Sequence, residues 1–126
     1  MPGVSNSSPL IYLSALGDLD LLPRLFGAIS IPMAVFREVA IEGRGQPGAL
    51  EVEAAAGTWL SLSSVQHPSV VLELMERTGI HRGEAEAIVL ASEQQQSMVM
   101  LDDHLRQLGF RLREEHYRLI LERAGE

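Results

Sequence analysis

The chain has 126 residues, of which 46% are apolar and 21% charged, as expected for one soluble domain with a hydrophobic core. It contains no cysteine, which excludes a disulfide framework and a cysteine-ligated zinc site and favours the reducing cytoplasm. The net charge of −7 argues against a general binder of duplex nucleic acid, and no apolar run is long enough for a signal peptide or a membrane span.

Strand-like and helix-like segments alternate along the chain. Brief apolar or alternating segments predict strands at residues 4–6, 28–32, 58–65 and 97–101. Helical spacing, with proline or glycine at the ends, predicts helices at 7–17, 18–27, 33–43, 49–57, 67–79 and 84–95. Beyond them, 102–109 fits a short helix or turn, and 110–126 fits a terminal amphipathic helix. Strands separated by helices indicate the α/β class, with a parallel sheet covered by helices on both faces.

Some helix ends carry recognisable signals. Ser7 or Ser8 is expected to cap the first helix, and Asp18 the second. The segment RGQPG at 44–48 predicts a loop, and GRGQPG has no lysine or following pattern of a phosphate-binding loop.

Acidic residues gather where such a sheet would place a ligand. Asn6 follows the first strand, and Asp102 and Asp103 follow the last one, so all three lie at carboxyl ends of strands. Glu38 lies within a helix, and Glu84 and Glu86 begin the helix of the segment GEAEAIVLASEQQQSMVMLDD. Mg²⁺ and Mn²⁺ prefer oxygen ligands of this kind, and two such ions can promote phosphodiester cleavage.

Each acid also has a purely structural interpretation. Glu84 and Glu86 are favoured at a helix start by the helix dipole, Asp102 fits an N-cap, and Glu38 fits a solvated helix position. Arg82 fits an ion pair with Glu86, four residues on, better than a phosphate contact. The histidines have no metal-ligand spacing and are interpreted as surface or loop residues: His67, His81, His104 and His116.

Six segments follow one another over nearly the whole chain: SNSSPLIYLSALGDLDLL, IPMAVFREV, GQPGALEVEAAAGTWL, RGEAEAIVLASE, MVMLDD and GFRLREEHYRLILERAGE. Together they resemble a family of PIN-domain-like proteins of bacteria and archaea. The resemblance implies one domain over 1–126, with a three-layer α/β/α fold and a central parallel sheet of about four strands. It also implies an Mg²⁺- or Mn²⁺-dependent ribonuclease, similar to the toxins of toxin–antitoxin pairs, with RNA as substrate and a small antitoxin protein as partner.

The resemblance assigns the acids to particular roles. Glu38, Glu84 and Asp102 match three acids of the family. These lie in the helix after the second strand, at the start of the helix that runs into the fourth strand, and at the end of that strand. Asn6 stands where most PIN nucleases have Asp. Glu86 and Asp103 are neighbours able to assist, and Ser7 or Ser8 supplies the hydroxyl residue that follows the first acid.

Two departures from the family pattern are visible. Asn6 offers an oxygen but no charge, so the affinity for a metal ion should be lower. Between LDD and the final helix, family members have a further strand–helix unit, whereas here LDDHLRQLGFRL joins the two almost directly. The fold is therefore expected to be shortened on its C-terminal side. The loss of an edge strand would expose apolar surface, which a homodimer partner or a domain swap would cover.

The leading hypothesis is a cytoplasmic, metal-dependent endoribonuclease of PIN type. The alternative is a catalytically degenerate PIN-like module that binds nucleic acid or protein, which Asn6 and the missing unit favour. A phosphate-ester hydrolase that uses the same acids is a third interpretation, but no separate nucleophile supports it.

Overall fold

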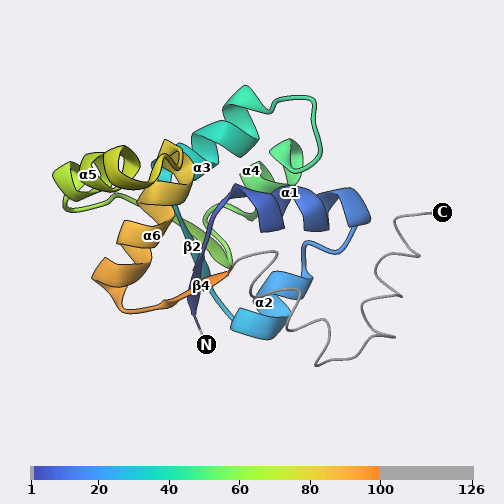
Figure 1. Cartoon of the computed structure of the whole chain (residues 1–126). Coiled ribbons are helices and arrows are strands. Elements are labelled where there is room, and N and C mark those ends of the chain that lie inside the picture. The colour runs from blue at the N-terminus through green and yellow to red at the C-terminus, as the bar shows by residue number, and fades with distance from the viewer. Residues whose placement is uncertain (1, 100–126) are drawn as a thin grey trace, which may run out of the picture.

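The computed structural model describes residues 2–99, in which four strands alternate with helices (Figure 1). The strands are β1 (Gly3–Ser5), β2 (Ile29–Pro32), β3 (Leu60–Ser63) and β4 (Ser97–Val99). The helices are α1 (Ser7–Leu16), α2 (Leu21–Phe26), α3 (Met33–Phe36), the π-helix η1 (Arg37–Glu42), α4 (Ala49–Ala55), α5 (Pro68–Thr78) and α6 (Arg82–Gln94). Every helix and strand expected before residue 100 is present, whereas the elements expected at 102–126 lie outside the described residues.

The strands form one sheet in the order β3-β2-β1-β4, and all neighbours are parallel. Val4 lies opposite Ser30 on one side and Met98 on the other. This confirms the predicted parallel sheet of about four strands. Parallel strands have their carboxyl ends at the same edge of the sheet. Asn6, which follows β1, and helix α3, which follows β2, therefore lie at neighbouring positions of this edge.

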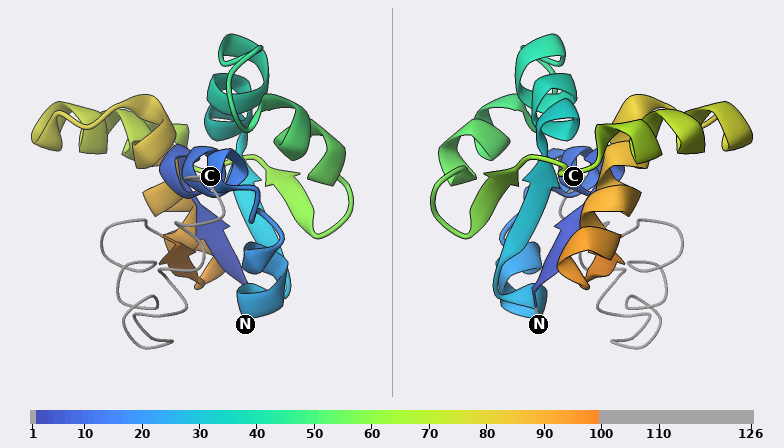
Figure 2. Two further views of the ribbon diagram at one scale, coloured as in Figure 1. Left: turned by 90° about the vertical axis from the view of Figure 1, so that its right-hand side faces the viewer. Right: turned by 90° about the vertical axis from the view of Figure 1, so that its left-hand side faces the viewer.

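Helices cover both faces of the sheet, which gives three layers (Figure 2). Ile29 and Leu60 point to one face and belong to a buried cluster with side chains of α1, α2 and α4. Val4 points to the opposite face, where it packs against Ala87 and Leu90 of α6. The alternation of side chains along each strand therefore divides the core into two parts.

Helix α5 packs on α6 rather than on the sheet. Val71 is buried against α6, and the Glu93 carboxylate accepts hydrogen bonds from the backbone N–H groups of Gln66 and His67, both at 2.9 Å. The Nδ1 atom of His67 lies 3.0 Å from the same carboxylate. The Gln66 N–H, followed by the contacts of His67, holds the pKa of Glu93 below its ordinary value, although partial desolvation opposes this effect. Glu93 thus fastens the start of α5 to the C-terminal half of α6.

The predicted helix at 33–43 is one continuous helix whose second part is a π-helix. Its first turn is α3, and η1 continues it to Glu42. Gly43 follows, and a Cβ atom there would lie 2.8 Å from the carbonyl oxygen of Val39. Glycine is therefore needed where η1 ends. π-Helical turns are rare in proteins, but those that occur are often found at functional sites. Glu38 lies in the first turn of this one.

Two of the predicted helix caps are wrong. Asn6 is the N-cap residue of α1, although its side chain makes no capping hydrogen bond, and Ser7 is already helical. Asp20, and not Asp18, precedes α2. The reason is that Gly17 turns the chain with φ +77°, and the N–H of Asp18 then donates to the carbonyl oxygen of Leu13 at 2.8 Å. Asp18 thus completes the end of α1 in the manner of a Schellman motif.

Strand β4 has a neighbour on one side only within residues 2–99, because β1 pairs with it and no other described strand does. The shortening expected on the C-terminal side concerns residues outside the described part and stays a prediction. Across the same residues, no helix is both long enough and apolar enough to cross a membrane.

Candidate functional site

Glu38 receives a hydrogen bond from a residue 31 positions earlier in the chain. The hydroxyl Oγ of Ser7 donates to Oε1 of Glu38 at 2.8 Å. Ser7 begins the helix that follows β1, and Glu38 lies in the helix that follows β2. Because β1 and β2 are adjacent and parallel, the two side chains meet at the carboxyl edge of the sheet. Of the two serines expected to supply this hydroxyl, Ser7 makes the contact with Glu38, while Ser8 is exposed.

The start of α6 lies against the same carboxylate. Gly83 is buried, and a Cβ atom built there would be 2.8 Å from Oε1 of Glu38 and 3.7 Å from Cγ2 of Val35. Glycine therefore leaves the space that the Glu38 carboxylate occupies. The negative charge also faces the N-terminal end of a 13-residue helix, where the helix dipole favours an anion.

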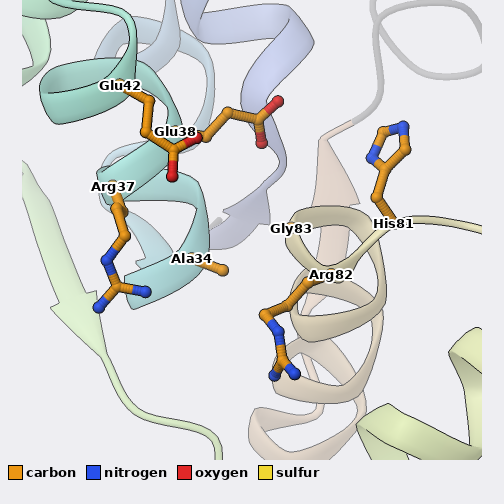
Figure 3. Close-up of a pocket in the computed structure, with 7 residues that line it drawn as sticks. All are labelled: Ala34, Arg37, Glu38, Glu42, His81, Arg82 and Gly83. Carbon is orange, nitrogen blue, oxygen red and sulfur yellow. The ribbon is translucent and has the colours of Figure 1, made fainter.

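A pocket of about 320 Å³ opens beside Glu38 between η1 and the start of α6 (Figure 3). One wall is formed by the α3–η1 helix and the other by the first residues of α6. The lining residues are Ala34, Arg37, Glu38, Glu42, His81, Arg82 and Gly83. Acidic and basic side chains of distant segments are thus brought to one concave surface.

Glu86 has a different environment from Glu38. Its Oε1 accepts a hydrogen bond from the backbone N–H of Ala34 at 3.2 Å, which satisfies a free donor in the first turn of α3. Its Oε2 lies 3.6 Å from an Nη atom of Arg82. The predicted pairing of Arg82 with Glu86 is confirmed. Glu86 therefore fastens α6 to the start of α3.

The other expected site residues are placed less completely. Glu84 is half-buried in the first turn of α6, next to Gly83, but it does not line the pocket. The side-chain oxygen Oδ1 of Asn6 is buried and has no hydrogen-bond partner within the described part of the chain. Asp102 and Asp103 lie outside it. The structure does show β4, the strand expected to precede them, in which Val99 lies opposite Ser5, one residue before Asn6.

The side-chain oxygen atoms of Glu38 and Asn6 are of the chemical type that a hard divalent cation binds. Glu38 offers a carboxylate whose orientation is fixed by Ser7, and Asn6 offers a buried neutral oxygen that lacks a partner among residues 2–99. Over the same residues, however, no group of three or more acidic or histidine side chains is close enough to hold a metal ion. A complete ligand set would therefore have to include a residue from outside this part, and Asp102 and Asp103 are acids of the required type.

A comparison with known protein families shows the family of this chain. A family model described as a PIN domain matches residues 2–108, which include every described strand and both Asp102 and Asp103. The chain belongs to the PIN-domain family. No curated protein and no solved structure matches it. The four-stranded parallel sheet flanked by helices is consistent with a PIN-like fold.

In this PIN domain, sequence reasoning missed several pocket residues. Arg37 and Glu42 were not singled out, although Glu42 follows Glu38 by four residues and such residues share a helix face. Gly83 was not singled out either, although a glycine between Arg82 and Glu84 near a helix N-terminus is typical of close packing. His81 is exposed, as expected, but it lies at the rim of the pocket.

Proposed function

We propose that this PIN domain is a metal-dependent endoribonuclease that hydrolyses RNA phosphodiester bonds in the cytoplasm. The observation that carries the proposal is the Glu38 carboxylate, held by Ser7 and enclosed by Gly83 beside an open pocket. In a PIN-domain family member, this position at the carboxyl edge of the sheet is where a nuclease site is expected.

Glu38, Glu84 and Asp102 would hold Mg²⁺ or Mn²⁺, with Asn6 and Asp103 assisting. Between the two acids of α6, Glu84 is favoured over Glu86 because the Glu86 carboxylate already binds the Ala34 N–H and Arg82. When bound, the ion supplies charge neutralisation of the phosphodiester and lowers the pKa of a water molecule.

The protein's own residues prepare this chemistry. The Ser7 hydroxyl fixes one rotamer of Glu38, so the second carboxylate oxygen, which accepts no hydrogen bond from residues 2–99, is oriented for a cation. The α6 N-terminus offsets part of the negative charge that would otherwise gather at this edge.

The test is cleavage of single-stranded RNA in the presence of Mn²⁺ by the wild type, Asp102→Asn and Glu38→Gln. The wild type should cleave, and both variants should lose at least about 100-fold in rate, as is usual when one charged group of such a site is removed. Glu76→Gln is the matched control, because Glu76 is exposed on α5 and does not line the pocket. Equal cleavage by the wild type and Asp102→Asn, or no cleavage by any of them, would contradict the proposal.

A binding-only role is the second candidate, and Asn6 is the observation that favours it, since an amide brings no charge to a metal site. Calorimetric titration of the wild type with Mn²⁺ separates the two functions. A saturable site that disappears in Glu38→Gln supports the nuclease, whereas the absence of a saturable site supports the binding module.

Toxin activity and assembly are further parts of the proposal. As a toxin, the protein should stop bacterial growth when its expression is induced, and Asp102→Asn should not. A small antitoxin protein would then be its partner. Within residues 2–99 β4 is an edge strand, which favours a homodimer that sedimentation equilibrium of the full chain would detect. A monomer at all concentrations would contradict this assembly.

A further inference from the structure

The pocket beside Glu38 has an arginine on each wall. Arg37 comes from η1 and Arg82 from the start of α6, and both side chains point toward the bottom of the view in Figure 3. Two of the five arginines in residues 2–99 therefore line one pocket, in a chain whose net charge is −7. Such a local concentration of guanidinium groups is unexpected on an acidic protein.

Arg37 differs from most arginines of the described part in having no carboxylate partner there. Three others form ion pairs with a residue four positions away in or next to their own helix, namely Arg24, Arg77 and Arg82. No ion pair or hydrogen bond of the Arg37 side chain is present among residues 2–99, although it is exposed in a pocket that also contains Glu42. Its five N–H donors are therefore available to a planar or tetrahedral oxyanion.

The charges of the pocket favour a phosphate only when a cation is present. The carboxylates of Glu38 and Glu42 balance the guanidinium groups of Arg37 and Arg82. A divalent cation at Glu38 would make the pocket net positive while the rest of the protein remains acidic. A phosphodiester would then be attracted to this pocket and repelled elsewhere.

We propose that Arg37, assisted by Arg82, binds a backbone phosphate of single-stranded RNA that lies across the pocket between η1 and α6. The contact is next to the phosphate that reacts at Glu38, so this inference rests on the proposed function. Arg82 contributes less, because its guanidinium group is shared with Glu86 at 3.6 Å. Arg37 is a substrate-positioning residue, and its contact is to the backbone and independent of base sequence.

The test is equilibrium binding of a short fluorescein-labelled single-stranded RNA, followed by anisotropy over a series of salt concentrations. All proteins carry Asp102→Asn so that cleavage does not interfere, and Mn²⁺ is present throughout at a concentration high enough to saturate the weakened site, because the pocket becomes net positive only with a cation. Arg37→Gln should weaken binding several-fold and reduce the slope of log K against log[salt] by about 0.7, the value for one phosphate contact to a single strand. Arg82→Gln should have a smaller effect.

Arg44→Gln is the matched control. Arg44 is exposed in the turn just after η1 and does not line the pocket, so it changes the net charge equally without touching the site. Equal affinities and slopes for Arg37→Gln and Arg44→Gln would overturn the inference. An equal loss of affinity for a poly-glutamate peptide would assign Arg37 to acidic protein segments and would also overturn it.

The two proposals can fail separately. If the wild type cleaves RNA with Mn²⁺ but Arg37→Gln binds RNA like the control, the nuclease stands and the arginine contact falls. If Arg37→Gln selectively weakens RNA binding but the wild type never cleaves, the contact stands and the nuclease falls.

Discussion

The Ser7 hydroxyl and the Glu38 carboxylate are joined by a hydrogen bond of 2.8 Å, and this bond links the helices that follow two adjacent strands. It connects the sheet edge directly to the acid on which the proposed activity depends. Several consequences of this arrangement can be measured.

Removing the Ser7 hydroxyl should affect both stability and the site. Ser7→Ala deletes the donor to Glu38 and should lower the free energy of unfolding by about 1 kcal/mol, a typical net value for one hydrogen bond. It should also weaken Mn²⁺ binding, because the Glu38 rotamer is no longer fixed. Denaturant unfolding and calorimetry measure the two effects. Ser8→Ala, at the exposed neighbouring position, should change neither; an equal effect of both variants would show that the Ser7–Glu38 bond is unimportant.

Alanine at Gly83 should disturb the site more than the fold. The added Cβ would lie 2.8 Å from Oε1 of Glu38, a side-chain end that can move away, so the free energy of unfolding should change by less than about 1 kcal/mol. RNA cleavage should fall roughly 10–100-fold, because the carboxylate is displaced.

A double-mutant comparison isolates the cause at Gly83. In a Glu38→Ala background the only recorded neighbour of the new Cβ that remains is Val35 at 3.7 Å, an ordinary contact. There Gly83→Ala should stabilise the helix by up to about 1 kcal/mol, the normal gain of alanine over glycine. Identical effects of Gly83→Ala in both backgrounds would contradict the close approach of Glu38.

Alanine at Gly43 should reduce the stability of the fold, whereas alanine at Gly83 mainly disturbs the site. Its Cβ would lie 2.8 Å from the backbone oxygen of Val39 and 3.0 Å from that of Glu38, and backbone cannot move aside as a side chain can. Gly43→Ala should therefore lower the free energy of unfolding by about 1–3 kcal/mol, as overpacking commonly does. Thermal unfolding followed by circular dichroism measures this loss. A Gly43→Ala protein as stable as the wild type would show that η1 can end without glycine.

Glu93 should make stability depend on pH. Its pKa in the folded protein lies below the ordinary value of 4.5, mainly because of the Gln66 N–H, so the folded state favours the ionised form. The stabilisation is present above the ordinary pKa and is lost as the pH falls through the lowered one. The difference in unfolding free energy between the wild type and Glu93→Gln should thus be largest near neutral pH and shrink in acid. Glu76→Gln is the control, and a difference that grows in acid would contradict this contribution.

The sequence predicted the larger features because they depend on local patterns. Strands separated by amphipathic helices specified the parallel sheet, and chain order alone placed Asn6 at the end of the first strand. The positions of Glu38 and Glu84 in helices followed in the same way. The pairing of Arg82 with Glu86 was predictable because both lie on one helix face.

What the sequence did not predict depends on contacts between distant segments. No local pattern predicts that the Glu86 carboxylate accepts the Ala34 N–H at the start of α3, whereas Glu84 makes no hydrogen bond or ion pair within the described part. The close approach of Gly83 to Glu38 and the π-helical form of η1 arise only when α6 packs against the α3–η1 helix. The roles of Asp102 and Asp103, a single domain over 1–126, and the expected homodimer stay predictions.

The position of β1 between β2 and β4 has a consequence for synthesis on the ribosome. The first strand to emerge gains one neighbour early and the other only after residue 99 has been made. Ser7 and Glu38 can meet in the first half of the chain, but the second wall of their pocket arrives with α6, in the last third. A nuclease built in this way would complete its substrate pocket only after most of the chain has left the ribosome, itself an assembly made largely of RNA.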